Sequence, residues 1–116
     1  MKDSLEMLTR NVRSFAQARD WEQFHTPKNL AMALSGETGE VLEHFQWLTA
    51  EQSQALDEPT RQAVSLELAD VLLYLVRLAD VLGIDLIDAA NRKISINGER
   101  YPVEKAKGRA NKYDQL

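Results

Sequence analysis

Acidic side chains occur at intervals of three residues in two separate parts of the sequence. Glu37 and Glu40 form one pair, and Glu67 and Asp70 form the other. A spacing of three puts both members of a pair on the same side of a helix. If the two helices pack side by side, four carboxylates meet at one place. Carboxylate oxygens without histidine or cysteine select Mg²⁺, or Mn²⁺ as its substitute, rather than zinc.

The second pair lies in an unusually apolar segment, ELADVLLYLVRL at residues 67–78. Apolar residues face almost every direction around this helix, a pattern typical of a buried helix. Two carboxylates near a core need protons, cationic partners or a metal ion. Either acidic pair alone is common on solvated helices. The two pairs together leave a metal site and ordinary surface helices as open alternatives.

A ferritin-like di-iron site is not expected. That site uses Glu-x-x-His on two helices. Here His44 stands four positions after Glu40 and next to Glu43, and the segment with the second acidic pair contains no histidine. The chain has no cysteine, so disulfides and thiolate metal sites are excluded.

Four helices are expected to position these side chains. Ser4 and Thr26 are typical N-caps, while Gly83 and the Asn97-Gly98 pair are typical stops. The expected helices span residues 4–18, 27–49, 59–82 and 84–97. We therefore predict an all-α fold: a single domain over residues 1–116, built as a four-helix antiparallel bundle with an extended C-terminal tail.

Two glycines interrupt the second expected helix. Gly36 and Gly39 flank its acidic residues, and each weakens a helix by about 1 kcal/mol relative to alanine. Such glycines indicate that something approaches the backbone closely. Another helix and a ligand are both open interpretations.

Charge is distributed unevenly along the chain. Its net charge is −4, yet residues 92–116 contain seven Lys and Arg against three Asp and Glu. An acidic body with a basic end argues against a nucleic acid polymer and suits a small polyphosphate; a merely solvated basic arm is the alternative. The longest apolar run, VLLYLV, is too short to cross a membrane, and the first ten residues do not form a secretory signal. A cytoplasmic location is expected.

Two longer stretches carry a resemblance to a known family. The runs GETGEVLEHFQW at 36–47 and ELADVLLYL at 67–75 resemble the MazG-like, all-α NTP pyrophosphatase superfamily, whose metal motif is Glu-x-x-Glu, a spacer, then Glu-x-x-Asp. RDWEQFH at 19–25, with Asn29-Leu30, and Ile96-Asn97, with Arg100-Tyr101-Pro102, are similar to its dCTP pyrophosphatase branch. The likeness covers nearly the whole chain.

The resemblance implies Mg²⁺-dependent hydrolysis of a dNTP to the monophosphate and pyrophosphate. It assigns Glu37, Glu40, Glu67 and Asp70 as metal ligands. Glu37 is the first candidate for the general base and Glu43 the second. The implied substrate is dCTP or a modified dCTP. Two alternatives stay open: the same chemistry on dUTP or another noncanonical nucleotide, and a non-catalytic helical interaction module with a structural metal.

The resemblance also implies a set of substrate-binding residues. Trp21 and Trp47 match base-binding aromatics, although core packing is the usual role of tryptophan. Tyr74, Asn97 and Tyr101 match positions that contact sugar or base, and Lys93 and Arg100 are candidates for the phosphates.

Three further positions bear on the base. His25 has a counterpart in the family and is interpreted as structural. His44 is interpreted as a surface residue or as support for a neighbouring ligand. Val12 stands where animal members of the branch place a histidine, and this difference leaves the preference for cytosine open.

An oligomer is expected on the same ground. Members of the family form homotetramers, built as dimers of dimers, with sites lined by more than one subunit. The tail, residues 102–116, would gain order by packing on a neighbouring subunit; a flexible tail is the alternative. Sanitation of the nucleotide pool and nucleotide supply are both compatible with this chemistry.

Overall fold

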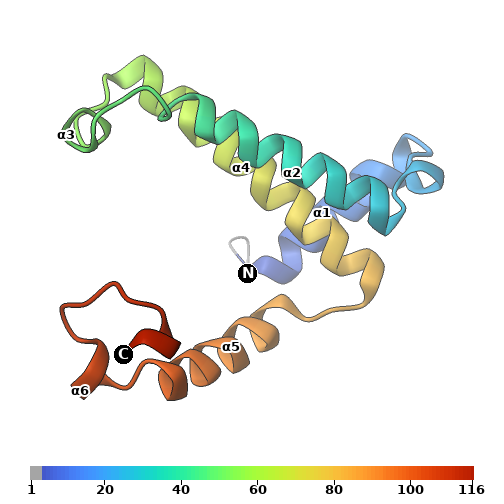
Figure 1. Ribbon diagram of the computed structural model, residues 1–116. Coiled ribbons are helices and arrows are strands. Elements are labelled where there is room, and N and C mark those ends of the chain that lie inside the picture. The colour runs from blue at the N-terminus through green and yellow to red at the C-terminus, as the bar shows by residue number, and fades with distance from the viewer. Residues whose placement is uncertain (1–3) are drawn as a thin grey trace. The chain divides into compact units, whose positions relative to one another are not determined.

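The computed structural model describes residues 4–116, so the first three residues of the predicted domain lie outside the described part. Every regular element in that part is helical, which confirms the all-α class (Figure 1). The elements are α1 (Leu5–Ala18), η1 (Glu22–Phe24), α2 (Pro27–Glu43), α3 (Ala50–Ser53), α4 (Glu58–Leu82), α5 (Leu86–Arg100), α6 (Val103–Ala106) and η2 (Tyr113–Gln115). The four long helices, α1, α2, α4 and α5, are those predicted.

The chain divides after Gly83 into two compact units. In the first unit, α4 is the central element: it packs along α2 and also against α1 (Figure 1). Small and branched side chains form the core of this unit: Ala16, Leu30, Val64, Val76 and Ala79. The second unit consists of α5, α6 and η2.

Three predicted helix caps, at Ser4, Thr26 and Gly83, are confirmed. The Ser4 hydroxyl accepts a hydrogen bond from the Met7 amide at 3.0 Å, and that of Thr26 accepts one from the Asn29 amide at 3.1 Å. Each bond satisfies an amide that lacks a partner within the helix. Gly83 ends α4 with φ of 67°, a conformation that costs glycine little.

The second long helix, α2, is shorter than predicted. It ends at Glu43, whereas the sequence predicted an end at Thr49. Beyond its end the backbone forms tighter bonds, such as that from the Phe45 amide to the Leu42 carbonyl at 2.9 Å. Thr49 instead caps α3 through a reciprocal pair of bonds with Gln52. A residue in this cap has extended backbone angles, so α2 cannot continue through it.

The fourth long helix continues past its predicted end. The Asn97-Gly98 pair lies inside α5, and the Tyr101 amide donates to the Asn97 carbonyl at 2.8 Å. The helix stops only before Pro102, which lacks an amide proton and disfavours helical angles in the residue before it. The glycine costs stability but does not break the helix.

The tail forms two short helical segments, α6 and η2, within the second unit. The guanidinium of Arg100 lies 4.7 Å from the centre of the Tyr113 ring. The rings of Tyr101 and Tyr113 meet edge to face with centres 6.1 Å apart. Residues near the end of α5 are therefore held against the last turn of the chain.

The expectation that α4 is buried on all sides is wrong for the single chain. Val64, Val76 and Ala79 are buried, but Leu66 is 69% exposed and Leu68 53% exposed. The apolar surface of α4 is therefore larger than the part that α1 and α2 cover. Among the described residues, no helix is both long and apolar enough to span a membrane.

The glycines of α2 face open space in the described part of the chain. A Cβ atom built on Gly36 or Gly39 would meet no atom within 4 Å. Close packing of another helix of the first unit therefore does not explain these two glycines. A ligand beside them stays a prediction.

Candidate active site

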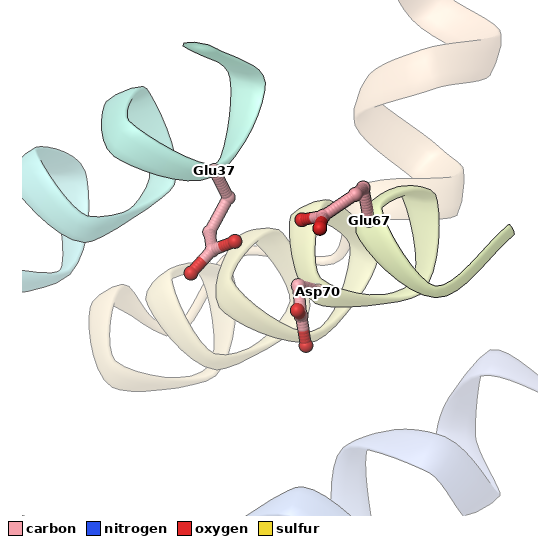
Figure 2. A group of neighbouring side chains, drawn as sticks. All are labelled: Glu37, Glu67 and Asp70. Carbon is pink, nitrogen blue, oxygen red and sulfur yellow. The ribbon is translucent and has the colours of Figure 1, made fainter. Parts of the chain in front are cut away.

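Three carboxylates converge where α2 lies along α4 (Figure 2). Glu37 comes from α2, and Glu67 and Asp70 come from α4. Each offers one oxygen, and these oxygens all lie within 4.8 Å of one another. The pairing of the two helices thus brings three of the four predicted carboxylates to one place: Glu37 of the first pair and both members of the second.

The fourth predicted ligand, Glu40, is exposed and lies beside this group. It is close enough to affect both glutamates. The neighbouring carboxyl group of Glu40 is the main cause that raises the pKa of Glu67, burial is the next, and repulsion from Glu40, Glu37 and Asp70 adds to the effect. Burial is the main cause that raises the pKa of Glu37, followed by repulsion from Glu40 and Asp70. Ionising the carboxyl groups of Glu37 and Glu67 in the folded chain therefore costs free energy.

The carboxylates fit a divalent cation. Glu37 and Glu67 each bury one oxygen, Oε2, that has no hydrogen-bond partner within residues 4–116. A buried acceptor without a partner is costly, and a charged one more so. A cation among these oxygens would satisfy both acceptors and offset the repulsion. Because every donor atom is a carboxylate oxygen, the group suits a hard ion such as Mg²⁺ or Mn²⁺.

The second candidate base lies outside this group. Glu43 is the last residue of α2 and is exposed, and it does not join the compact cluster formed by Glu37, Glu67 and Asp70. Glu37 is the candidate base that the fold places among the other carboxylates.

A pocket of about 390 Å³ adjoins the acidic group and is bounded by α1, η1 and α4. Its lining is mostly apolar, and Asp70 belongs both to it and to the acidic cluster. The lining residues are Leu8, Asn11, Val12, Phe15, Ala16, Trp21, His25, Asp70, Leu73, Tyr74 and Arg77. An apolar pocket with a few polar groups is the usual form of a small-molecule site.

Aromatic rings form one wall of the pocket. Trp21 packs edge to face against Phe15, with ring centres 5.8 Å apart, and against His25 at 6.3 Å. Trp21 and Tyr74, both predicted to bind substrate, line the same pocket. Val12, where the resemblance leads us to expect a histidine, also lines the pocket.

Trp47 does not line this pocket. It lies in the turn after α2 and is 87% exposed, so the core-packing alternative is wrong for the single chain. Its predicted contact with the base stays a prediction.

The other four predicted substrate contacts lie in the second unit. Lys93, Asn97 and Arg100 belong to α5, and Tyr101 caps its end. The spacing of four and then three residues puts Lys93, Asn97 and Arg100 on one side of that helix. The fold thus groups them, and their contact with substrate stays a prediction.

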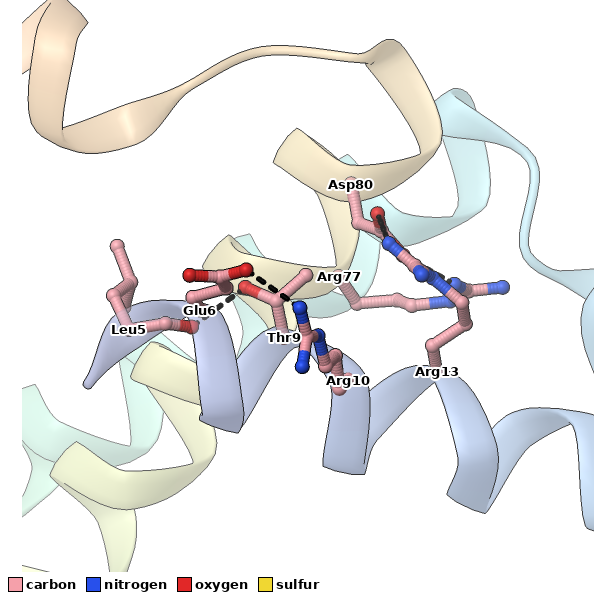
Figure 3. Close-up of polar contacts among 7 residues, drawn as sticks. All are labelled: Leu5, Glu6, Thr9, Arg10, Arg13, Arg77 and Asp80. Carbon is pink, nitrogen blue, oxygen red and sulfur yellow. Dashed lines mark hydrogen bonds and ion pairs between the residues drawn. The ribbon is translucent and has the colours of Figure 1, made fainter. Parts of the chain in front are cut away.

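Sequence reasoning missed a polar network at one end of the pocket. Asp80 accepts two hydrogen bonds from Arg13, at 2.9 and 2.6 Å, and one from Arg77 at 3.0 Å (Figure 3). Arg77 also donates from Nε to Nδ1 of His25 at 3.0 Å. The signal was present in the sequence: Arg77 is the only charged residue between Asp70 and Asp80.

Comparison with known proteins gives consistent matches. A sequence model of the MazG-like family matches residues 32–116. The dCTP pyrophosphatase 1 of Mus musculus is 47% identical over 115 residues, which cover 97% of this chain and 68% of that protein. The Homo sapiens protein of the same name is 45% identical with the same coverage. The crystal structure of a pyrophosphatase from Archaeoglobus fulgidus has a similar fold, with a TM-score of 0.80, 42% identity, and coverage of 84% of this chain and 91% of that one.

Proposed function

Because the chain belongs to the MazG-like family, we propose that it hydrolyses dCTP, or a modified dCTP, to the nucleoside monophosphate and pyrophosphate. The observation that carries this proposal is the junction at Asp70. That residue joins a cluster of carboxylates to a mostly apolar pocket with an aromatic wall. Phosphates and base of one small molecule therefore have adjoining places to bind.

The carboxylates supply the metal-binding part. We propose that Glu37, Glu67 and Asp70, with Glu40 beside them, hold Mg²⁺, for which Mn²⁺ can substitute. When bound, Mg²⁺ supplies charge that neutralises the phosphates and the leaving pyrophosphate. The buried, unpaired oxygens of Glu37 and Glu67 support this assignment.

Glu37 is the proposed general base. It lies among the proposed metal ligands, with one carboxylate oxygen within 4.8 Å of those of Glu67 and Asp70. A carboxylate at this place is positioned to take a proton from a water beside the phosphates. In this role, Glu37 takes a proton from the water that attacks the α-phosphorus, and the bond from that phosphorus to the leaving pyrophosphate breaks.

The pocket wall supplies the base-binding part. Trp21 presents an indole that is 42% exposed, and a flat base can stack on such a surface. Tyr74 stands one helical turn beyond Asp70, between the acidic cluster and the far end of the pocket. Its hydroxyl is thus suited to the sugar or to the base edge.

We also propose that the protein acts as a homo-oligomer, a tetramer built as a dimer of dimers. Exposed leucines on α4 and the open face at Gly36 and Gly39 are surfaces that a second copy would cover. Trp47 and the tail, residues 102–116, would then contribute to a neighbouring site. A cytoplasmic location stays a prediction from the sequence.

A substrate panel tests the proposed function. Pyrophosphate release is measured for dCTP, 5-methyl-dCTP, dUTP and the other dNTPs, with Mg²⁺ and with EDTA. We expect Mg²⁺-dependent release with dCTP or its methylated form preferred. Preference for dUTP would favour the noncanonical-nucleotide alternative. If no dNTP yields pyrophosphate although the protein binds Mg²⁺, the alternative of a non-catalytic helical module is favoured.

A further inference from the structure

The pocket has two chemically different ends along α4. Asp70 stands at the acidic end, Tyr74 one turn further, and Arg77 about two turns from Asp70. Seven residues of helix rise about 10 Å and return to nearly the same face. A nucleotide whose phosphates lie at the carboxylates therefore points its base toward Arg77.

Arg77 is a buried cation held in a fixed place. It is only 6% exposed, although it lines the pocket. Its Nε donates to His25 and its Nη1 donates to Asp80, both at 3.0 Å. Among residues 4–116, Nη2 has no hydrogen-bond partner. The guanidinium thus has a donor to spare in the pocket wall.

His25 is prepared as a second donor by its contact with Arg77. Its Nδ1 accepts a hydrogen bond from Arg77, so the proton of the neutral ring lies on Nε2. Burial, and then the positive charge of Arg77, lower the pKa of His25, which keeps the ring neutral near pH 7. The remaining polar atom of the ring is therefore an N–H donor.

We propose that Arg77 is the specificity-determining residue of this enzyme, donating together with His25 to two adjacent acceptors on the edge of the base. The proposal rests on the proposed function. Cytosine presents such a pair, its ring N3 and its O2. Uracil and thymine instead carry a hydrogen on N3, which would face these donors without an acceptor. A site that pairs buried polar groups with one base rejects a base that leaves them unpaired.

The charge at this end of the pocket agrees with an acceptor edge. Arg77 is the cation that lines this end of the pocket, and His25 is neutral. A cation in the pocket wall attracts the electron-rich N3 and O2 of cytosine. Uracil carries a hydrogen on N3 between its carbonyl oxygens O2 and O4, so it offers no two adjacent acceptors. Val12 offers no hydrogen-bond donor, whereas Arg77 and His25 offer two that are joined by a hydrogen bond.

Steady-state kinetics on dCTP and dUTP test the proposal. In Arg77→Met we expect kcat/KM for dCTP to fall at least about tenfold, mainly through KM, while that for dUTP changes less than about twofold. Arg77→Lys, which keeps the charge but loses the planar fork, should also lower the dCTP to dUTP ratio. His25→Phe, at a half-buried position, should lower it even if both Arg77 variants fail to fold.

Arg13→Met is the matched control. It removes the other arginine bound to Asp80, and Arg13 does not line the pocket. The dCTP to dUTP ratio of this variant should stay within about twofold of wild type. An equal effect of Arg13→Met and Arg77→Met on the ratio, or no effect of Arg77→Met and His25→Phe, would overturn the proposal.

Binding of the product nucleotides separates this proposal from the proposed function. Calorimetry in EDTA compares dCMP with dUMP, so neither metal nor turnover is needed. We expect wild type to bind dCMP at least about fivefold more tightly, and Arg77→Met to lose the difference. That result would uphold the role of Arg77 even if no dNTP were hydrolysed. Equal binding of dCMP and dUMP by wild type would overturn it even if dCTP were hydrolysed.

Discussion

Removing the charge of Asp80 should destabilise the fold through Arg77. The side chains of Arg77 and Asp80 are only 7% and 13% exposed, and in Asp80→Asn the buried guanidinium keeps only the neutral His25 as a strong partner. Breaking a buried ion pair costs about 3–5 kcal/mol. Because Asp80 is not wholly buried, the lower end applies, about 3 kcal/mol. For a domain of this size, that corresponds to a fall in Tm of roughly 12 °C.

The matched variant is Arg13→Gln, which removes the other partner of Asp80. Arg13 is 46% exposed, so its loss should cost less than about 1 kcal/mol. The assay is urea denaturation followed by circular dichroism for wild type, both single variants and the double variant. Equal and small effects of the two single variants would refute the idea that Asp80 mainly compensates a buried Arg77.

The difference in stability between wild type and Asp80→Asn should depend on pH. Hydrogen bonds from Arg13 lower the pKa of Asp80 most; burial opposes the shift, while the charges of Arg13 and Arg77 reinforce it. The folded state therefore holds the charged form more strongly than the unfolded state does. This stability is fully present above the ordinary value of 3.8 and is lost as pH falls through the lowered one. The difference between wild type and Asp80→Asn should accordingly be full at pH 7 and shrink below about pH 4.

Three other outcomes are expected. Glu67→Gln should lower turnover by ~100-fold or more, yet raise the Tm of the protein in EDTA at pH 7.5. The pKa of Glu67 is raised in the folded state, so its contribution to stability is present below pH 4.5 and is lost as pH rises through the raised value. An unchanged Tm and an unchanged rate would contradict the proposed site. Trp47→Ala should raise KM several-fold and disturb base preference while Mg²⁺ binding, measured by calorimetry, persists; unchanged selectivity would leave this indole outside the site. Deleting residues 102–116 removes Tyr113 from Arg100 and Tyr101 and should weaken assembly, measured by light scattering, or activity; indifference in both would mean a free arm.

The acidic centre could be predicted from the sequence because its signal is local. Two pairs at a spacing of three lie on two helices, and one pair interrupts an apolar run. The spacing places both members of each pair on one face of its helix, so only the pairing of α2 with α4 has to be assumed. The structure supplies that pairing. It also separates the compact group, Glu37, Glu67 and Asp70, from Glu40 beside it.

The polar end of the pocket could not be predicted, because it depends on contacts between distant segments. Arg13 and Asp80 are 67 positions apart, and His25 and Arg77 are 52 apart. No periodic pattern specifies which carboxylate a buried arginine meets. The misplaced ends of α2 and α5 have a different cause. After Glu43 the backbone turns through tighter hydrogen bonds before Thr49 caps the next helix, and Gly98 is tolerated inside α5.

The most direct test of the account is hydrolysis of dCTP in H₂¹⁸O with Mg²⁺, followed by mass spectrometry of both products. The account predicts dCMP and pyrophosphate, with the label in dCMP because water attacks the α-phosphorus. It also predicts loss of both products in EDTA and a fall of ~100-fold or more in Asp70→Asn. Label in pyrophosphate, release of dCDP and phosphate, or wild-type turnover by Asp70→Asn would contradict it.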